Sequence, residues 1–425
     1  MTAWKRAAAP LLATALAALA VAGCGRGDDD ETTGGQAPQG ISTGPATGTI
    51  TVWAMGTEGE KLSVLAKDFE AANPGAKVKV TAVPWDSAHD KISTAIAANT
   101  TPDVSMIGTT WMGEFAKTGA LDQTPSDFDK SAFFPGAWDT SVVDGTSYGV
   151  PWYVETRLIY YRTDLAQKAG AQPPTNWQQL KDFTTALKER GGAQWGINLQ
   201  PGDTGSWQTF LPFVWQAGGD VMDATGQWTL DSPQMTQALE YYKSFFTEKL
   251  APGPLQPGEL ESMFIDGKIG AFISGPWHIG ILEDQGGAGF EQKFDVALMP
   301  REQTGTSFVG GSDLAVFKNS KNRDSAWKFV QYLSRSDVQV KWYQTVSDLP
   351  AVQSGWNDPA LAGDKFLSKF GEQLKDAKSP PAIPTWEQVA AAIDSEVEKA
   401  TIGNTSPADA VKAMQQQATS IGTGT

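Results

Sequence analysis

Residues 49–107 read TITVWAMGTEGEKLSVLAKDFEAANPGAKVKVTAVPWDSAHDKISTAIAANTTPDVSMI. Alternating or continuous apolar residues predict three strands in this segment, at 49–53, 77–83 and 104–107. Apolar residues at helical spacing predict two helices between the strands, at 60–73 and 92–98. This alternation of strands and helices predicts an α/β protein with a mostly parallel sheet.

The chain beyond Tyr161 is more helical. Its clearest amphipathic stripes, with apolar residues on one helical face, lie at 235–246, 326–333 and 389–397. Glycine- and proline-rich stretches at 251–258 and 286–289 predict loops, and neither has the flanking residues of a phosphate-binding loop.

The first 24 residues have the layout of an export signal. Lys5 and Arg6 precede an apolar run at 7–22, which is shorter than the ~20 residues that a membrane span needs. The run ends in Val21-Ala22-Gly23-Cys24, which resembles the lipobox of bacterial lipoproteins. That resemblance implies a signal peptide at 1–24 and a lipid attached to Cys24, which would anchor the protein to the extracellular face of the membrane. The alternative is an ordinary signal peptide with an incidental cysteine.

The segment 25–48 has almost no apolar residues and predicts a flexible tether. The remaining chain is too long for one compact core, so its length predicts two lobes.

Composition excludes several classes of function. Lys and Arg number 33 against 48 Asp and Glu, and this acidic balance argues against nucleic acid as a partner. Cys24 is the only cysteine, so an internal disulfide cannot form. Only His89 and His278 could supply imidazole, which disfavours a histidine-based metal site or catalytic triad. We expect no cofactor, no metal and a monomer.

Short motifs along 49–419 together resemble the family of extracellular solute-binding lipoproteins of ABC importers, which includes maltose-binding protein. The motifs that carry the resemblance, by their order and spacing, are Val52-Trp53, Gly56-Thr57-Glu58-Gly59, Pro102-Asp103-Val104, Gly149-Val150-Pro151, Tyr160-Tyr161-Arg162-Thr163-Asp164-Leu165, Pro174-Thr175-Asn176-Trp177, Phe264-Ile265-Asp266-Gly267-Lys268, Gly275-Pro276-Trp277 and Gly310-Gly311.

The resemblance implies a two-lobed, periplasmic-binding-protein-like α/β fold of the class II type, with lobes that are discontinuous in sequence. It places lobe 1 at 49–153 and 308–355, and lobe 2 at 158–306 and 360–425. Hinge crossings are expected near 154–157, 307 and 356–359. A sugar would bind between the lobes, and closure about the hinge would present a surface to the membrane permease.

A sugar needs aromatic platforms for its C–H faces and directional polar partners for its hydroxyls. The 16 tryptophans outnumber the 8 tyrosines, which fits a need for such platforms. The resemblance implies that Trp277 stacks on the ligand, with a core tryptophan as the alternative. It places Thr57 and Glu58 in a ligand-contacting loop, although an acidic residue also suits the start of a helix.

The resemblance also gives Glu155 the position of a ligand carboxylate, beside Trp152 in the cleft floor. The alternative is that Arg157 simply neutralises Glu155 in the hinge. Thr110 and Trp111 replace a charged pair of maltose-binding protein, so a different sugar or pose is implied.

The other candidates are placed by the same resemblance. They are Asp203, Trp207, Gly311, Ser312, Asp348 and Trp386. The alternative is a core position for Trp207 and a tight structural turn for Gly311 and Ser312.

Three functions remain open from the sequence. The first is capture of a mono- or oligosaccharide for an ABC permease, without chemistry. The second is a secreted glycosidase that uses Glu58 and Glu155 as its pair of carboxylates. The third keeps the fold but takes a glycerophosphodiester or a peptide, and the lack of a basic cluster argues against a phosphorylated cargo.

Overall fold

The computed structural model describes residues 40–256 and 258–424, so Cys24 and the predicted signal peptide lie outside the described residues. The three predicted N-terminal strands are present as β1 (Gly48–Met55), β2 (Ala76–Val83) and β3 (Val104–Gly108). Strand β1 pairs in parallel with both neighbours. Its alternate residues Ile50, Val52 and Ala54 have no exposed surface, as expected of a strand with one face on the core.

These strands belong to a seven-stranded sheet in the described residues, with the order β11-β6-β10-β3-β1-β2 and β12 at the edge of β10. The added strands are β6 (Val150–Thr156), β10 (Ser307–Val316), β11 (Leu349–Pro350) and β12 (Ala377–Lys378). Strand β10 is antiparallel to β3 and β6, and β11 is antiparallel to β6. The sheet is therefore mixed, not mostly parallel, because β10 re-enters it from the opposite direction.

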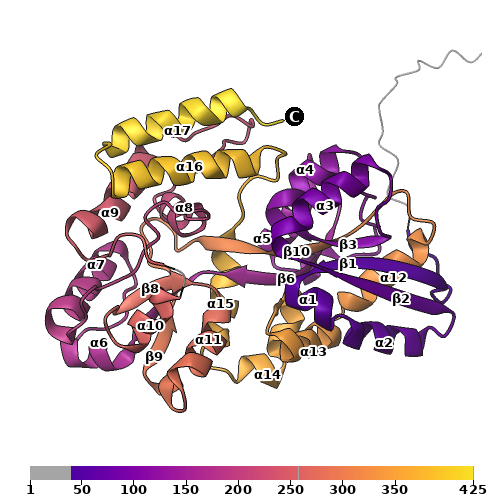
Figure 1. Ribbon diagram of the computed structural model, residues 1–425, viewed down its shortest axis with the longest axis horizontal. Coiled ribbons are helices and arrows are strands. Elements are labelled where there is room, and N and C mark those ends of the chain that lie inside the picture. The colour runs from indigo at the N-terminus through magenta and orange to yellow at the C-terminus, as the bar shows by residue number, and fades with distance from the viewer. Residues whose placement is uncertain (1–39, 257, 425) are drawn as a thin grey trace, which may run out of the picture. The chain divides into compact units, whose positions relative to one another are not determined.

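Helices cover this sheet to form lobe 1 (Figure 1). They are α1 (Gly56–Lys61), α2 (Ser63–Ala72), α3 (Trp85–Ala97), α4 (Met112–Lys117), α5 (Pro135–Thr140), α12 (Arg323–Leu333) and α13 (Ser336–Val346). A small hairpin, β4 (Val142–Val143) and β5 (Thr146–Ser147), follows α5. The predicted helix at 60–73 is divided at Leu62 into α1 and α2.

Lobe 2 is built on an antiparallel sheet with the order β8-β7-β9. Its strands are β7 (Leu158–Arg162), β8 (Ala271–Ser274) and β9 (Phe294–Ala297). The helices that follow β7 are α6 (Thr163–Ala169), α7 (Trp177–Ala186), α8 (Trp207–Gln216), α9 (Pro233–Thr247), α10 (Glu259–Ile265) and α11 (Trp277–Gly286). The C-terminal helices are α14 (Pro359–Ala362), α15 (Leu367–Gln373), α16 (Trp386–Thr401) and α17 (Pro407–Ile421).

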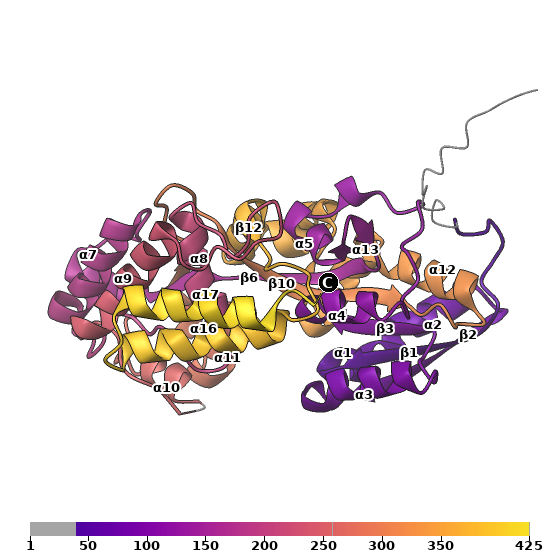
Figure 2. The same ribbon diagram turned by 90° about the horizontal axis from the view of Figure 1, so that it is seen from above.

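The three amphipathic stripes are confirmed as α9, α12 and α16, each with its apolar face buried. Helices α16 and α17 lie side by side (Figure 2). They belong to lobe 2, although the chain returns to lobe 1 between α11 and α14.

Part of the predicted tether is fixed to lobe 1. The Ser42 amide donates to Asp324 at 2.6 Å, and the Thr47 amide donates to the Ser325 hydroxyl at 2.9 Å. Ala46 has no exposed surface. Residues 41–47 therefore differ from a free tether, because side chains of lobe 1, two of them at the start of α12, accept hydrogen bonds from their backbone amides.

Two crossing segments are tied to each other at the junction of the lobes. The Thr156 hydroxyl donates to the Phe308 carbonyl at 2.6 Å, and the Ser307 hydroxyl donates to the Arg157 carbonyl at 2.9 Å. Both hydroxyl-bearing residues are fully buried. The segments predicted as hinges near 154–157 and 307 thus form one hydrogen-bonded pair, and the exact lobe boundaries stay a prediction.

Candidate ligand-binding cleft

A cavity of about 400 Å³ lies at the junction of the two lobes. Lobe 1 contributes residues that follow the carboxyl ends of its parallel strands, where α/β sheets usually bind ligands. These residues are Glu58 after β1, Trp85 after β2, and Thr109, Thr110 and Trp111 of the short helix η1 (Thr109–Trp111) after β3. Lobe 2 contributes Gln208 of α8 and Trp277 of α11, and β6 contributes Tyr153 and Glu155.

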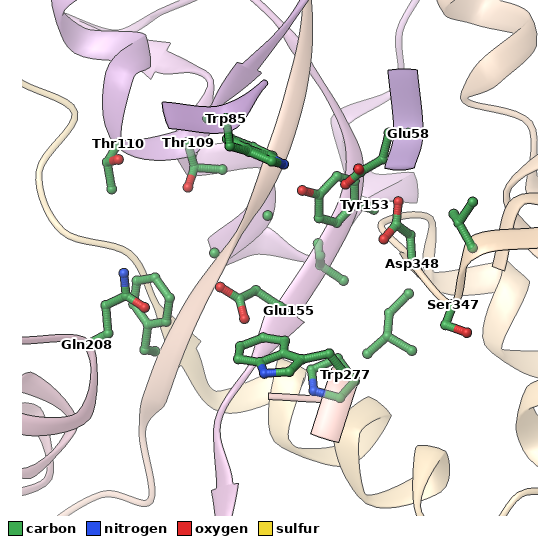
Figure 3. Close-up of a pocket in the computed structure, with 18 of the residues that line it drawn as sticks. Glu58, Trp85, Thr109, Thr110, Tyr153, Glu155, Gln208, Trp277, Ser347 and Asp348 are labelled. Carbon is green, nitrogen blue, oxygen red and sulfur yellow. The ribbon is translucent and has the colours of Figure 1, made fainter. Parts of the chain in front are cut away.

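The two indoles of the cavity are unusually exposed for large apolar side chains. Among the described residues, the large hydrophobic side chains with high exposure are Val64, Trp85, Trp277 and Ile402. Trp85 is 40% exposed and Trp277 is 43% exposed, and both line this one cavity. Figure 3 shows them on opposite sides of it with Glu155 between them. Exposed aromatic faces cost hydration free energy, so this pair indicates a ligand with apolar faces.

Trp277 is held in place by its neighbours. The Arg157 guanidinium lies 4.6 Å from the centre of the Trp277 ring, a cation–π contact. An ideal Cβ on Gly275 would lie 2.0 Å from the Trp277 ring, so only glycine allows the indole to fold back over this turn. The Tyr160 hydroxyl fixes the turn by donating to the Gly275 carbonyl at 2.6 Å.

A buried hydrogen-bonded chain also supports the start of α11. The Ser274 hydroxyl and His278 Nδ1 are 2.7 Å apart, and His278 Nε2 lies 3.1 Å from Glu261. Burial lowers the pKa of His278, which keeps its imidazole neutral at pH 7. This order of groups is that of a catalytic triad, but none of the three lines the cavity. Their geometry therefore supports a role in positioning the turn that carries Trp277.

On the lobe 1 side, the backbone of Gly56 lies close against the Trp85 indole and positions it. Trp85 is the first residue of α3, and an ideal Cβ on Gly56 would lie 2.9 Å from its indole. Gly56 also has a φ of +52°, a conformation that favours glycine. The Trp111 ring meets Trp85 edge to face at 5.7 Å between centroids.

Two carboxyl groups and a phenol gather on one side of the cavity (Figure 3). The Tyr153 hydroxyl is hydrogen-bonded to Glu58, and the Trp342 indole donates to Asp348 at 3.0 Å. Burial raises the pKa of Glu58. Burial and the nearby Glu58 carboxylate raise the pKa of Asp348 well above its usual range. These oxygens are therefore poorly hydrated acceptors that gain from a ligand hydroxyl donor.

Glu155 has a different environment in the middle of the cavity. Arg157 donates to it at 2.7 Å and also donates to the Gln208 side-chain oxygen. Burial raises the pKa of Glu155, and Arg157 opposes this effect. Arg157 thus fixes a carboxylate and an amide at once, and both remain on the cavity wall.

The return strand β10 adds backbone to the wall at Gly310 and Gly311. Gly311 has a φ of +127°, and a Cβ there would lie 2.2 Å from the Tyr153 carbonyl oxygen. An ideal Cβ on Gly310 would lie 2.8 Å from Glu155 Oε1. Side chains at these positions would therefore displace β6 and the Glu155 carboxyl group.

Seven of the residues predicted from the sequence line this cavity. They are Glu58, Thr110, Trp111, Glu155, Trp277, Gly311 and Asp348. The structure thus brings together side chains from both lobes, and their contact with a ligand stays a prediction.

Three other candidates lie in the protein interior. The Trp152 ring is 1% exposed and stacks on Trp342 at 5.1 Å. The Ser312 hydroxyl donates to the Ile107 carbonyl, and Trp386 is fully buried. Each differs from the expected cleft position because its element turns that side chain toward the core.

The remaining candidates are also outside the main cavity. Thr57 is exposed beside it, and Asp203 is exposed in the loop before α8. Trp207 is 3% exposed and meets Trp386 edge to face at 5.1 Å, so it is a core side chain of lobe 2.

Sequence reasoning missed Trp85, Thr109, Tyr153 and Gln208, which line the cavity. Trp85 could have been predicted, because it lies just after the predicted strand at 77–83, and ligands usually bind at the carboxyl ends of parallel strands. Gln208 had no such signal, because a glutamine in the first turn of a helix is usually solvent-exposed.

Within residues 40–256 and 258–424, no helix is long and apolar enough to cross a bilayer. The same residues contain no group of three or more His, Cys, Asp or Glu side chains arranged to hold a metal ion.

Two lobes joined by crossing segments, with a cavity at the junction, define a periplasmic-binding type of protein. A family model described as bacterial extracellular solute-binding protein matches residues 54–340, which is more than half of the chain. The chain belongs to this family, and the resemblance found in the sequence is confirmed. The family consists of binding proteins that act outside the cytoplasm.

Known proteins are similar to the chain over most of its length. The diacetylchitobiose binding protein DasA of Streptomyces coelicolor is 29% identical over 93% of this chain and 94% of its own. The solved structure of the sugar-binding protein MalE of Xanthomonas citri is 32% identical, with a TM-score of 0.83 over 88% of this chain and 97% of its own. The GacH receptor of Streptomyces glaucescens, solved alone and with acarbose, is 28% identical with a TM-score of 0.76, over 88% of this chain and 98% of its own. The predicted two-lobed fold is confirmed by these structures.

Proposed function

We propose that this protein captures a mono- or oligosaccharide in the interlobe cavity and delivers it to the permease of an ABC importer. The observation that carries the proposal is the pair of exposed indoles, Trp85 and Trp277, that face one cavity ringed by carboxylates. Indole faces suit the C–H faces of a pyranose, and the carboxylates suit its hydroxyls. The diacetylchitobiose named for DasA, the acarbose named for GacH and the description of MalE as sugar-binding support the same class of ligand.

The charges of the cavity argue against a phosphorylated cargo. Glu58, Glu155 and Asp348 line the cavity, and the nearby Arg157, which is not among the lining residues, is already paired with Glu155. A glycerophosphodiester would bring its own negative charge into this poorly hydrated group of acids.

A thermal-shift screen across disaccharides and monosaccharides tests the proposal. A cognate sugar at 100 times its Kd should stabilise the protein by about 2.7 kcal/mol and change its tryptophan fluorescence. Trp277→Ala should abolish the shift without unfolding the protein, because that indole is 43% exposed. Ile402→Ala is the control, since Ile402 is equally exposed at 44% but lies outside the cavity. Unchanged binding by Trp277→Ala would remove Trp277 from the site.

We propose that binding occurs without chemistry. A glycosidase needs two carboxyl groups about 5 Å or about 6.5–9.5 Å apart around the scissile bond, and Glu58 and Glu155 are the pair to test. The cognate sugar should be recovered intact by mass spectrometry after long incubation. Cleaved product that disappears in Glu155→Gln would make the protein an enzyme.

We also propose that Cys24 carries the lipid anchor and that the mature protein is a monomer. Mass spectrometry of the mature N-terminus should find an acylated Cys24, and Cys24→Ala should release the protein from the membrane fraction. Light scattering should give the mass of one chain. A membrane-bound Cys24→Ala protein would contradict the proposed anchor.

A further inference from the structure

The side chain of Arg157 contacts three walls of the cavity, although Arg157 is not among the residues that line it. Its guanidinium donates to Glu155 of β6 at 2.7 Å and to the side-chain oxygen of Gln208 of α8. The same group lies over the Trp277 ring of α11, 4.6 Å from its centre. Arg157 itself is buried, with 7% of its surface exposed. A ligand in the cavity therefore faces the three partners of Arg157 and not its guanidinium (Figure 3).

A guanidinium suits this position better than an ammonium group. It presents five N–H donors in one rigid plane, so it can bond a carboxylate and an amide in fixed directions while it stacks on a ring. Two contacts in turn hold Arg157. The Phe308 ring centre lies 5.4 Å from the guanidinium carbon, and the Ser307 hydroxyl donates to the Arg157 carbonyl at 2.9 Å. A lysine ammonium is a single point charge and could pair with Glu155, but not with all three partners.

Arg157 also affects the charge of Glu155. Among the described residues, the cation paired with Glu155 is Arg157. Burial raises the pKa of Glu155, and Arg157 opposes this effect. The other titratable groups that interact with the two residues are Tyr153, Tyr160 and His278, and none of them is a cation at pH 7. Without Arg157, Glu155 would therefore take up a proton at a higher pH.

The elements packed around this pair supply no second cation within the described residues. Helix α8 contains no charged residue. The carboxyl groups of β10 and α11 are Asp313, which is bonded to Thr140, and Glu283 and Asp284, which are exposed. The site thus depends on one guanidinium for positive charge at this wall.

We infer that Arg157 is a positioning residue of the sugar site, which holds Glu155 as a carboxylate and fixes Gln208 and Trp277 in place without touching the ligand. This inference rests on the proposed function and deepens it, because it identifies a buried residue that sets the affinity of the site for sugar. A charged acceptor forms hydrogen bonds about twice as strong as a neutral one. The bond from a sugar hydroxyl to Glu155 therefore depends on Arg157 as well.

Replacement of Arg157 by methionine tests the inference, by calorimetric titration with the sugar found by screening. Arg157→Met should weaken binding about ten- to a hundredfold at pH 7, because it releases three wall residues at once. Arg162→Met is the matched control. Arg162 is 6% exposed, pairs with Asp164 at 2.6 Å and lies 5.5 Å from the centre of the Phe290 ring, but it lines no wall of the cavity. Its loss should lower stability and leave sugar binding unchanged.

The pH dependence of binding distinguishes positioning from simple packing. In Arg157→Met the pKa of Glu155 rises, so this variant should lose a further factor of about ten relative to the wild type as the pH falls from 8 to 5. In a Glu155→Gln background, the same replacement should cost a constant factor at every pH. Glu58 and Asp348 are present in both backgrounds, so comparison of the two ratios removes their contribution.

Arg157→Lys keeps the positive charge but loses the planar fork. It should show no added dependence on pH, and it should bind sugar about three- to tenfold more weakly than the wild type. This variant serves if Arg157→Met fails to fold, and wild-type affinity of Arg157→Lys would then overturn the inference.

Wild-type affinity of Arg157→Met would overturn the inference and leave the proposed function intact. The same loss at every pH in both backgrounds would also overturn it, because Arg157 would then act through packing alone. Absence of binding to any carbohydrate by the wild-type protein would overturn the proposed function and the inference together.

Discussion

Two tryptophans on separate lobes lie on opposite sides of one cavity. Trp85 packs on the Gly56 backbone, and Trp277 lies over Arg157 and the Gly275 turn. Neither ring fills a core, so each can be removed without opening a cavity inside the protein. This makes their contribution to binding separable from their contribution to stability.

Trp85→Ala should weaken sugar binding by about ten- to a hundredfold, because it removes one of two apolar platforms. Isothermal titration calorimetry with the sugar found by screening measures the change. Val64→Ala is the matched control, since Val64 is 39% exposed on lobe 1 and lines no wall of the cavity. Equal affinities of Trp85→Ala and Val64→Ala would exclude Trp85 from the site.

Asp313 gives the protein a specific dependence of stability on pH. It is fully buried in β10, accepts a hydrogen bond from the Thr140 hydroxyl, and its pKa is raised by burial to about 8. Between its ordinary pKa of 3.8 and about 8, the folded state holds a proton that the unfolded state has lost. Its contribution to stability therefore falls as pH rises through this window.

Asp313→Asn should remove that dependence. The stability of the variant relative to the wild type should grow from pH 5 to pH 8, by up to about 1.4 kcal/mol per pH unit. Chemical denaturation at several pH values measures this difference. A difference that stays constant with pH would mean that Asp313 does not titrate in this range.

The prediction that Trp152 lines the cavity is wrong, and the alternation of side chains along strand β6 explains why. Along β6, the side chain of Trp152 is 1% exposed and packs in the core, while Tyr153 and Glu155 line the cavity. Because neighbouring residues of a strand point to opposite faces, Glu155 and Trp152 could not both face the cleft. Applying this period to the sequence would have selected Tyr153 in place of Trp152.

Helix α11 depends on one glycine for the position of its first residue. The Trp277 ring occupies the space of a Cβ on Gly275, whereas a Cβ on Gly280 in the same helix would meet nothing within 4 Å. A methyl group at Gly275 must therefore push the indole away from the turn. The indole can move, because it is exposed.

Gly275→Ala should weaken sugar binding at least about tenfold while changing the free energy of unfolding by less than about 1 kcal/mol. Gly280→Ala is the control and should leave binding unchanged, with a stabilisation of up to about 1 kcal/mol from helix propensity. Titration and chemical denaturation of both variants measure the two effects. A Gly275→Ala protein with normal affinity would show that the indole position does not matter.

The elements with strong local patterns could be predicted from the sequence. The parallel strands β1 to β3 and the helices α9, α12 and α16 follow from their apolar periods. The mixed character of the large sheet could not, because β10 pairs with β3 across about two hundred intervening residues. The attachment of the loop before α8 to Asp394 was equally hidden, because Asp394 accepts from the backbone amides of Gly205 and Trp207 and no side-chain pattern marks such a contact.

At the scale of the whole molecule, the paired crossing segments are the place where a hinge would act. Thr156 and Phe308, and Ser307 and Arg157, are joined across the two segments. These two bonds join the crossing segments directly. The presence of two lobes was predicted from the family resemblance and from chain length, and no local sequence pattern indicated it.

Sugar binding should bring the lobes closer together. Cys24 is the only cysteine, so a Cys24→Ser background accepts spin labels at Lys67→Cys in α2 and Glu240→Cys in α9, both exposed. The distance between these labels should shorten by several ångströms on sugar addition, as in hinge closure. A control pair within lobe 1, Lys67→Cys and Lys321→Cys, should not change. Constant distances in both pairs would contradict closure.

A crystal structure of the protein with the sugar found by screening tests the central claim most directly. We predict a sugar ring between Trp85 and Trp277, with its hydroxyls hydrogen-bonded to Glu155 and Glu58. A sugar bound elsewhere, with both indoles free of contact, would contradict this account.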